Sequence, residues 1–160
     1  MEYDRQLLYP RQVILATSQS GGKSNIITLA WHCPLSSKPP LVGISVGKTR
    51  FSHSLISDGR DFVISIPTEG MTDKVLLIGD KSGKDVDKFS ETGLTAVKGD
   101  VVKAPIIKEC PINIECKLVA ELDVGDHTLF VGEVVATHVS KSDDRLLFDL
   151  GGRNFLGIKK

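Results

Sequence analysis

Apolar residues stand at every second position from Ile112 to Val124, and this pattern limits the fold more than any other feature of the chain. Side chains of a β-strand point alternately to its two faces, so the pattern predicts a half-buried antiparallel strand with its polar residues facing outward. Gly125 and Asp126 then form a turn signal, and residues 127–140 fit a second long strand. Together the two segments predict a β-hairpin around which the rest of the chain must fold. The apolar positions are Ile112, Ile114, Cys116, Leu118, Ala120, Leu122 and Val124, and the polar positions between them include Asn113, Glu115, Lys117, Glu121 and Asp123.

Shorter apolar runs of strand length fill much of the remaining sequence. They are rich in Val, Ile and Thr and are bounded by Gly, Pro and Ser clusters, which is typical of strands in a sheet. Many short strands with only two or three helices predict a mainly β protein whose antiparallel sheet is a closed or nearly closed barrel, because closure removes exposed sheet edges. These runs cover residues 12–18, 26–31, 41–46, 62–67, 146–150 and 154–158.

Two helices are expected between the strands. Thr49 or Arg50 can open a helix over residues 51–59 that stops at Gly59, and Thr72 can cap another that runs to Gly79. Residues 85–89 fit a single helical turn, and residues 94–105 fit short strands joined by a turn at Gly99 and Asp100.

Length and charge narrow the class of protein. A chain of 160 residues with no internal repeat or low-complexity linker predicts a single domain over residues 1–160. Its 20 basic and 20 acidic residues balance, so no overall field favours nucleic acid or an acidic membrane surface. No run has the length of a transmembrane helix, and no signal peptide is visible. Three cysteines, an odd number, argue against a disulfide framework and suit a reducing compartment. We expect a cytoplasmic protein that binds neither nucleic acid nor membrane.

Several common catalytic and binding motifs are absent from the sequence. Gly47, Lys48 and Thr49 resemble the end of a P-loop, but the glycine required five residues before Gly47 is Val42. No Gly-x-Ser-x-Gly or Gly-x-Gly sequence occurs, which argues against a serine hydrolase elbow and a dinucleotide-binding βαβ unit. No Cys or His pair has the short spacing of a structural zinc site, so no metal is expected.

The segment from Lys48 to His53 nevertheless suits one phosphate group. If a helix begins near Thr49, its free N–H groups face an anion, with Arg50 as a bidentate donor and Ser52 as a hydroxyl donor. A solvated basic turn that caps a helix is the alternative interpretation.

Four segments in the same order resemble the flavin reductase-like family, which includes the flavoredoxins and adopts an FMN-binding split barrel. They are the run from Asn25 to Pro67, the phosphate-type cluster inside it, the Gly-Asp-His hairpin of residues 125–139, and the closing segment of residues 146–158. In the closing segment this chain has Phe155 where the family often has tyrosine, so a hydroxyl is lost near the expected ligand. Within the first run the matching positions are Asn25, Thr28, Trp31, Pro34, Pro39, Pro40, Arg50 and Ser52.

The resemblance implies an FMN-binding oxidoreductase whose flavin accepts a hydride from NAD(P)H and passes electrons to free flavin, ferric iron or a protein. A non-enzymatic FMN-binding electron carrier without a nicotinamide site is the alternative, and a β-barrel interaction module without flavin is a third possibility. The flavin ring is expected beside residues 28–31, and the phosphate beside residues 48–53. The implied cofactor-binding residues are Asn25, Thr28, Leu29, Ala30, Trp31, Ser45, Gly47, Lys48, Arg50, Ser52 and His53.

Three of the site residues have simpler readings as well. His127 is the catalytic candidate because the resemblance brings it to the flavin from outside, yet it also fits a surface residue at a hairpin turn. Trp31 fits core filling or a subunit contact, and Asn25 fits a turn before a strand. The resemblance further implies a homodimer with FMN near the subunit interface, with the contact near Pro39 and Pro40 or the C-terminus.

Overall fold

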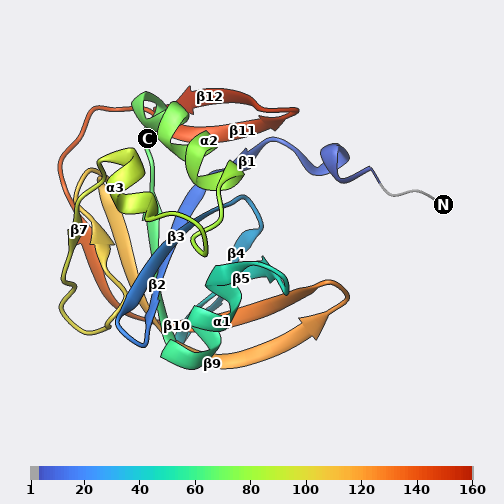
Figure 1. The fold of residues 1–160 in the computed structure, drawn as a ribbon. Helices are drawn as coiled ribbons and strands as arrows, with labels where there is room; N and C mark the ends of the chain where they lie inside the picture. The colour runs from blue at the N-terminus through green and yellow to red at the C-terminus, as the bar shows by residue number, and fades with distance from the viewer. Residues whose placement is uncertain (1–3, 160) are drawn as a thin grey trace.

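The structure is a computed structural model that describes residues 4–159, and it confirms the mainly β, antiparallel architecture (Figure 1). Its main sheet has seven strands in the order β3-β2-β6-β9-β10-β5-β4, and a smaller sheet has the order β1-β11-β12. The main strands are β2 (Ile14–Ser20), β3 (Lys23–Leu29), β4 (His32–Ser37), β5 (Pro40–Gly47), β6 (Asp61–Ile66), β9 (Ile112–Val124) and β10 (His127–Val139). The others are β1 (Arg11–Gln12), β11 (Leu146–Gly151), β12 (Asn154–Ile158), and the paired β7 (Ala96–Val97) and β8 (Ile106–Ile107).

The main sheet curls so that its two edge strands lie end to end but do not pair. The edge strands β3 and β4 follow each other in the chain and are joined only by Ala30 and Trp31. The backbone N–H of Ser45 on β5 donates to the carbonyl of Trp31 at 2.9 Å, which continues the β4–β5 ladder by one step into this connection. The barrel is therefore nearly closed, with a seam at residues 30–31.

Two strands of the main sheet are buried on both faces. On β2, Ile14 and Ala16 face the inside of the barrel, whereas Val13, which precedes the strand, and Leu15 face a second hydrophobic cluster beneath the helices. All six residues of β6 are buried. Continuous apolar runs are typical of such strands, because neither face meets water.

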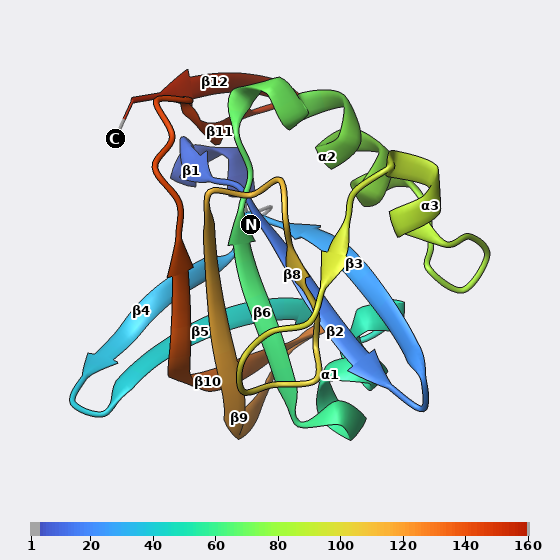
Figure 2. The same ribbon diagram turned by 90° about the vertical axis from the view of Figure 1, so that its left-hand side faces the viewer.

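Three helices cover the sheet: α1 (Phe51–Gly59), α2 (Thr72–Asp80) and α3 (Lys88–Thr92). Figure 2 shows α2 and α3 on one side of the barrel, with β11 and β12 above it, and α1 near its lower end. The turns Arg5–Leu8 and Glu69–Met71 are 3₁₀-helical. Among the described residues, none of the helices combines the length and apolar character needed to cross a membrane.

The helix predicted over residues 51–59 is confirmed, whereas each predicted end of the second helix is off by one residue. α1 ends at Gly59 as predicted, and the residue with a left-handed backbone that follows it is Arg60, at φ 62°. Gly59 is needed for close packing, since a Cβ there would collide with the backbone carbonyl of Gln19. Thr72 is the first residue of α2 instead of its cap, and its hydroxyl donates to the carbonyl of Glu69 at 2.7 Å.

The long hairpin is confirmed, but two polar residues on its outer face are buried rather than exposed to solvent. Asn113 and Glu115 are 3% and 0% exposed. The loop between β7 and β9 crosses this face of the sheet, and its backbone groups need hydrogen-bond partners that water cannot supply there. The predicted turn at Gly99 and Asp100 lies in the connection of residues 98–105 between the paired strands β7 and β8, so the second strand begins later than predicted, at Ile106.

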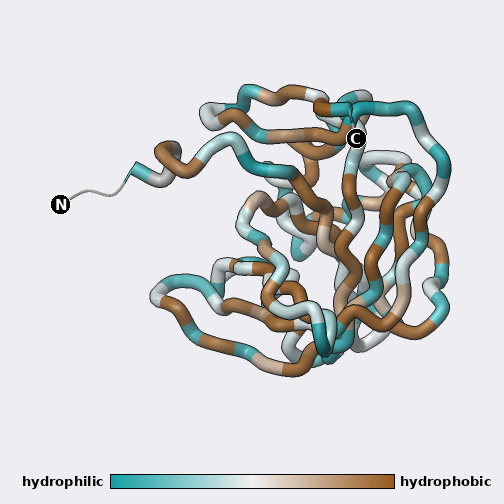
Figure 3. Tube along the Cα trace, turned by 180° about the vertical axis from the view of Figure 1, so that it is seen from behind, coloured by the Kyte–Doolittle hydropathy of each residue, from teal (hydrophilic) through white to brown (hydrophobic). Residues whose placement is uncertain are grey.

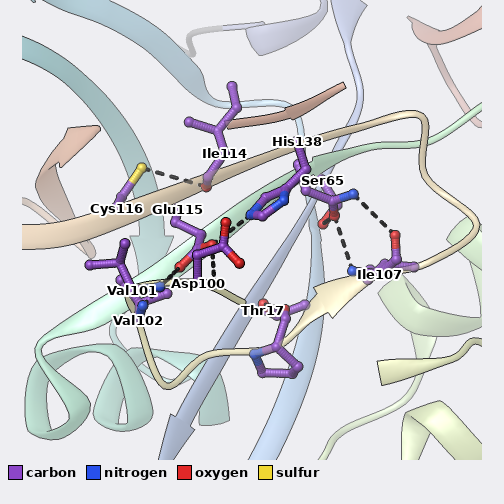
Figure 4. A network of polar contacts seen from close by, with 12 residues as sticks. Thr17, Ser65, Asp100, Val101, Val102, Ile107, Ile114, Glu115, Cys116 and His138 are labelled. Atoms are coloured by element: carbon purple, nitrogen blue, oxygen red, sulfur yellow. Dashed lines mark hydrogen bonds and ion pairs between the residues drawn. The ribbon is translucent and has the colours of Figure 1, made fainter. Parts of the chain in front are cut away.

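Glu115 holds this loop through its carboxylate (Figure 4). Its Oε1 accepts from the backbone N–H of Asp100 at 2.7 Å and lies 2.6 Å from Nε2 of His138. Its Oε2 accepts from the N–H groups of Val101 and Val102, both at 2.8 Å. Asp100, Glu115 and His138 bring possible metal-ligand atoms within 4.8 Å of one another. The four hydrogen bonds already occupy the lone pairs of Glu115, so they account for the close approach of these side chains without a metal.

Asn113 and Asp61 extend the same support along the loop. Asn113 Oδ1 accepts from the N–H of Ile107 at 3.0 Å, and its Nδ2 donates to the carbonyl of the same residue at 3.1 Å. Asp61 accepts from the N–H groups of Lys103 and Ala104, both at 3.1 Å. The loop therefore forms a second layer whose backbone is bonded to side chains of the sheet.

The far half of the hairpin is exposed. Leu122 and Val124 near its turn are 57% and 52% exposed, and Leu35 on β4 is 44% exposed. Figure 3 shows the hairpin projecting at the lower left of the molecule, with hydrophobic segments along it. The alternation that predicted a half-buried strand therefore leaves an apolar surface uncovered in the single chain.

Candidate functional site

A cavity of about 540 Å³ opens at the seam of the barrel. It lies between the end of β3, the end of β5, the start of α1, the residues after α2 and the start of β10. Ten of the twelve predicted site residues line it: Asn25, Thr28, Leu29, Ala30, Trp31, Ser45, Gly47, Arg50, Ser52 and His127.

Lys48 and His53 are not among the lining residues. Lys48 Nζ lies 3.2 Å from a carboxylate oxygen of Asp123, near the turn of the hairpin. His53 Nε2 lies 2.8 Å from the hydroxyl of Thr128, and its ring packs edge-on against Phe130 at 5.1 Å. Both side chains connect the start of α1 to the hairpin and do not point toward the other candidates.

The start of α1 presents unpaired donors to the cavity. Arg50 occupies the cap position with an extended backbone, and its side chain makes no capping hydrogen bond. The N–H groups of Phe51 and Ser52 come before the first intrahelical bond and have no partner in the described part of the chain. Such a helix start attracts an anion through its free N–H groups and its dipole.

Ser52 is positioned as a donor by Asn25. The amide Nδ2 of Asn25 donates to Oγ of Ser52 at 2.9 Å, and both residues are buried. Because Oγ already accepts one hydrogen bond, its own O–H is available to a ligand. Gly83 packs closely against Asn25, since a Cβ at Gly83 would collide with the amide oxygen.

Lys88 adds a buried positive charge that the sequence did not reveal. The residue is 5% exposed, and its Nζ donates to the carbonyls of Ile26 at 3.0 Å and Ile78 at 2.7 Å. Burial, and then the nearby charge of Arg50, lower its pKa from 10.5 to about 8. The ammonium group has a third N–H to donate, and no carboxylate among residues 4–159 forms an ion pair with it.

Lys88 and Arg50 line the same cavity, and neither forms an ion pair within residues 4–159, which is unfavourable by itself. Desolvation and mutual repulsion both disfavour the charged state of Lys88 beside Arg50. An anion with several oxygens would relieve both effects and would use the donors of Ser52 and the helix start as well. This end of the cavity therefore has the chemistry of a phosphate site.

The seam offers backbone donors along another wall of the cavity. Ala30 lies outside every strand, and its N–H has no partner within the described chain. The hydroxyl of Thr28 donates to the carbonyl of Val75 at 2.8 Å, so this side chain joins β3 to α2 rather than reaching a ligand. A flat molecule with polar atoms on its edge could accept from the exposed backbone here.

Trp31 and His127 lie against each other at one place in the cavity wall. Their ring centroids lie 4.8 Å apart with a tilt of 33°. Nδ1 of His127 lies 2.7 Å from Oδ1 of Asp126, and the hydrogen bond from His127 lowers the pKa of Asp126. Since Nδ1 is held by this carboxylate, Nε2 is the nitrogen free to meet a ligand, and it lies near Gly47.

Sequence reasoning missed several other lining residues, which come from three distant segments. Phe155, which was noted for its missing hydroxyl, does line the cavity. Only a helical turn over residues 85–89 was predicted in the loop that follows α2, although Gly83 was a signal of close backbone approach there. The missed residues include Tyr9, Gly79, Asp80, Lys81, Ser82, Gly83, Lys84, Lys88 and Asp149.

The sequence matches the family described as "Flavin reductase like domain" over residues 5–157. A protein of unstated function from Archaeoglobus fulgidus is 41% identical over 138 residues, which are 86% of this chain and 76% of that protein. A ferric-chelate reductase (NAD(P)H) from the same organism is 29% identical over 84% of this chain and 79% of its own. An NADH-dependent FAD reductase from Streptomyces globisporus is 30% identical over 91% of this chain and 78% of its own.

Solved structures share the fold. An FMN-binding protein from Thermus thermophilus with bound 1-cyclohex-2-enone has a TM-score of 0.89 at 27% identity, over 99% of this chain and 92% of that chain. The flavoredoxin of Desulfovibrio vulgaris (Miyazaki F) has a TM-score of 0.88 at 28% identity, over 100% of this chain and 94% of that chain. The predicted split-barrel fold is thereby confirmed.

Proposed function

Because the chain belongs to the flavin reductase-like family, we propose that it is an FMN-binding oxidoreductase that accepts a hydride from NADH or NADPH and passes electrons to free flavin, ferric iron or a protein partner. The observation that carries the proposal is the buried Lys88, which shares the cavity with Arg50 and the free start of α1 and has no carboxylate partner in residues 4–159. A single terminal phosphate fits this donor set.

The residues of the cavity fit the rest of FMN as well. Its volume of about 540 Å³ lies within the range of roughly 300 to 1,000 Å³ typical of small-molecule sites. The phosphate would bind Arg50, Ser52 and Lys88, and the polar edge of the ring would lie along the backbone of residues 28–31. The amide of Asn25 would hold Ser52 in place for the phosphate.

The bound flavin supplies the redox chemistry, since its ring takes up the hydride of a dihydronicotinamide, leaves the oxidised nicotinamide, and later gives two electrons to an acceptor. The backbone N–H groups at the seam would stabilise negative charge on the ring edge. His127 would orient the incoming donor through Nε2, with Asp126 holding the other nitrogen. Trp31 supports the His127 ring at 4.8 Å.

A second candidate is a non-enzymatic FMN-binding electron carrier without a nicotinamide site. The likeness to a flavoredoxin structure favours it, whereas the relatives that are NAD(P)H-dependent and NADH-dependent reductases favour the enzyme. Reduction of the bound flavin by a dinucleotide separates the two.

We also propose a homodimer with FMN near the subunit interface. Leu122 pairs with Leu129, which in turn pairs with the cavity residue Ser45, so these side chains share one face of the sheet. Paired residues in a sheet point to the same side. The exposed Leu122, Val124 and Leu35 thus continue the surface from which Ser45 and His127 reach the cavity. A second copy would cover this apolar surface and help to enclose the flavin.

The test begins with the purified protein and its colour. We expect flavin absorption, release of FMN rather than FAD on denaturation, and anaerobic bleaching on addition of NADH or NADPH. A colourless protein that binds no added FMN would contradict the proposal. A yellow protein that neither dinucleotide bleaches, but a chemical reductant does, would establish the carrier in its place.

A further inference from the structure

A second cavity of about 260 Å³ lies behind Trp31. It shares two lining residues, Ala30 and Trp31, with the cavity at the seam. Its other lining residues are Arg11, Gln12 and His32, and His32 is fixed by a contact of 2.9 Å between its Nε2 and the carbonyl of Gln12. The two cavities therefore adjoin at Ala30 and Trp31.

Arg11 is held in this second cavity by its neighbours. Its Nε donates to the carbonyl of Leu8 at 3.0 Å. Its guanidinium lies over the ring of Tyr9 at 5.2 Å and over the ring of Trp31 at 5.7 Å. Stacking on aromatic faces holds a guanidinium while its terminal nitrogens stay free.

The charge of Arg11 is not balanced by a carboxylate. Within residues 4–159 it forms no ion pair, and Asp149, which is opposite it in the β1-β11 register, accepts instead from the N–H of Gly151 at 2.8 Å. Arg11 therefore presents two terminal nitrogens in a fixed orientation. Such a fork matches the oxygens of a phosphate.

We propose that Arg11 binds the pyrophosphate of the nicotinamide dinucleotide while the nicotinamide lies at the Trp31 and His127 end of the first cavity. This inference rests on the proposed function, because it assumes a flavin in the first cavity. A ribose separates the nicotinamide from the pyrophosphate, so the two subsites need only a ring's width between them, and Trp31 provides that spacing. Arg11 then determines the preference for a phosphate-bearing donor and takes no part in hydride transfer.

The experiment compares two hydride donors that differ in charge. NADH carries the pyrophosphate, whereas N-benzyl-1,4-dihydronicotinamide carries the same reactive ring and no phosphate. Flavin reduction is followed anaerobically in the FMN-loaded wild-type protein and in Arg11→Ala, after a fluorescence titration with FMN has shown equal flavin affinity. We expect KM for NADH to rise about tenfold in Arg11→Ala with kcat nearly unchanged, and the rate with the uncharged donor to stay the same.

Two further measurements separate phosphate binding from support of Trp31. Arg11→Lys keeps the charge but loses the planar fork, so it should restore part of the affinity for NADH. Raising the salt concentration should raise KM for NADH in the wild type and much less in Arg11→Ala, because screening acts on a charge that the variant lacks. Arg145→Ala is the matched control, since this exposed arginine lines neither cavity.

Several results would overturn the proposal. If Arg11→Ala slowed flavin reduction equally with both donors, Arg11 would only hold Trp31 in place. If its KM for NADH were unchanged, Arg11 would have no role in donor binding. The proposal would also be refuted if the uncharged donor reduced the flavin of the wild-type protein and NADH did not. FMN binding would then remain intact. A protein that binds no FMN at all would instead refute the proposed function itself.

Discussion

His138 and Glu115 lie side by side on the sheet beneath the loop between β7 and β9, with Nε2 of His138 2.6 Å from Oε1 of Glu115. Burial by itself raises the pKa of Glu115, but the hydrogen bonds from His138 and from the backbone of residues 100–102 outweigh it and lower the pKa from 4.5 to about 2. The carboxylate is therefore favoured in the folded state, and its charge is tied to the loop.

The first prediction concerns acid stability. Because the folded pKa of Glu115 is lowered, its contribution to stability is fully present above about pH 4.5 and is lost as the pH falls toward about 2. Glu115→Gln should flatten this part of the pH profile and lower the free energy of unfolding at pH 7 by about 1 to 3 kcal/mol, since the loop N–H groups lose acceptors. Urea titrations between pH 2 and pH 7 measure both effects, with Glu133→Gln, in the same sheet but outside this network, as the control.

The second prediction concerns the phosphate subsite. Arg50→Ala should weaken FMN binding by about 2 kcal/mol, because a charge-assisted hydrogen bond to the phosphate is lost. Lys23→Ala should have no effect, as Lys23 does not line the cavity at the seam. Quenching of flavin fluorescence gives both affinities, and equal values would place the phosphate elsewhere.

The third prediction follows from the lowered pKa of Lys88. With a pKa of about 8, Lys88 is cationic below that pH and becomes neutral above it. FMN affinity should therefore be highest at pH 6 to 7 and fall as the pH rises through 8, whereas Lys88→Met should bind more weakly and without this pH step. The titration is repeated at each pH with circular dichroism as the control for folding, since Lys88 also binds two backbone carbonyls. A wild-type affinity that is constant from pH 6 to pH 9 would remove Lys88 from the site.

The fourth prediction tests whether His127 takes part in hydride transfer or is only a surface residue at the hairpin turn. If Nε2 orients the hydride donor, His127→Ala should keep its FMN and its fold but reduce its flavin about tenfold more slowly, which corresponds to roughly 1.4 kcal/mol in the hydride-transfer complex. Anaerobic stopped-flow measurements test this, with His138→Gln as a control histidine outside the cavity. An unchanged rate would return His127 to a surface turn residue, and loss of FMN alone would make it a binding residue.

The fifth prediction concerns assembly. Leu122→Glu should convert the proposed dimer into a monomer at micromolar concentration and weaken FMN binding, because a charge would be placed in the apolar contact. Val139→Glu, at the other end of the hairpin and 67% exposed, should leave the dimer unchanged. Light scattering distinguishes the two, and a monomeric wild-type protein would rule out the dimer.

The sequence allowed the fold to be predicted because strand patterns are local. Alternation located the hairpin from Ile112 onward, and apolar runs located most other strands. The edge strand β4 was missed because Pro34 interrupts a polar stretch, although a proline on an edge strand sacrifices no ladder hydrogen bond when its missing N–H faces outward. Local patterns could not show that a loop would cover Asn113 and Glu115, since the covering residues belong to another part of the chain.

The candidate site was predictable only in part, for a similar reason. The residues around Arg50 share one helix start, so their chemistry is visible within six positions of the sequence. Lys88 reaches the cavity from a different helix, and nothing in its neighbours distinguishes it from a solvated lysine. Lys48 was included because it is adjacent in sequence, but its side chain pairs with Asp123.

The seam at Ala30 also links recognition to folding. In a completely paired barrel, every strand N–H is hydrogen-bonded to a neighbouring strand. In this barrel the N–H of Ala30 stays without a partner in the described chain, at the place where the two edge strands do not pair. A bound ring that accepts from this N–H would act as a short missing strand, and its binding energy would add to the free energy of unfolding by mass action. The midpoint of thermal unfolding should then rise with flavin concentration. The fraction of folded protein would therefore depend on how much flavin is available.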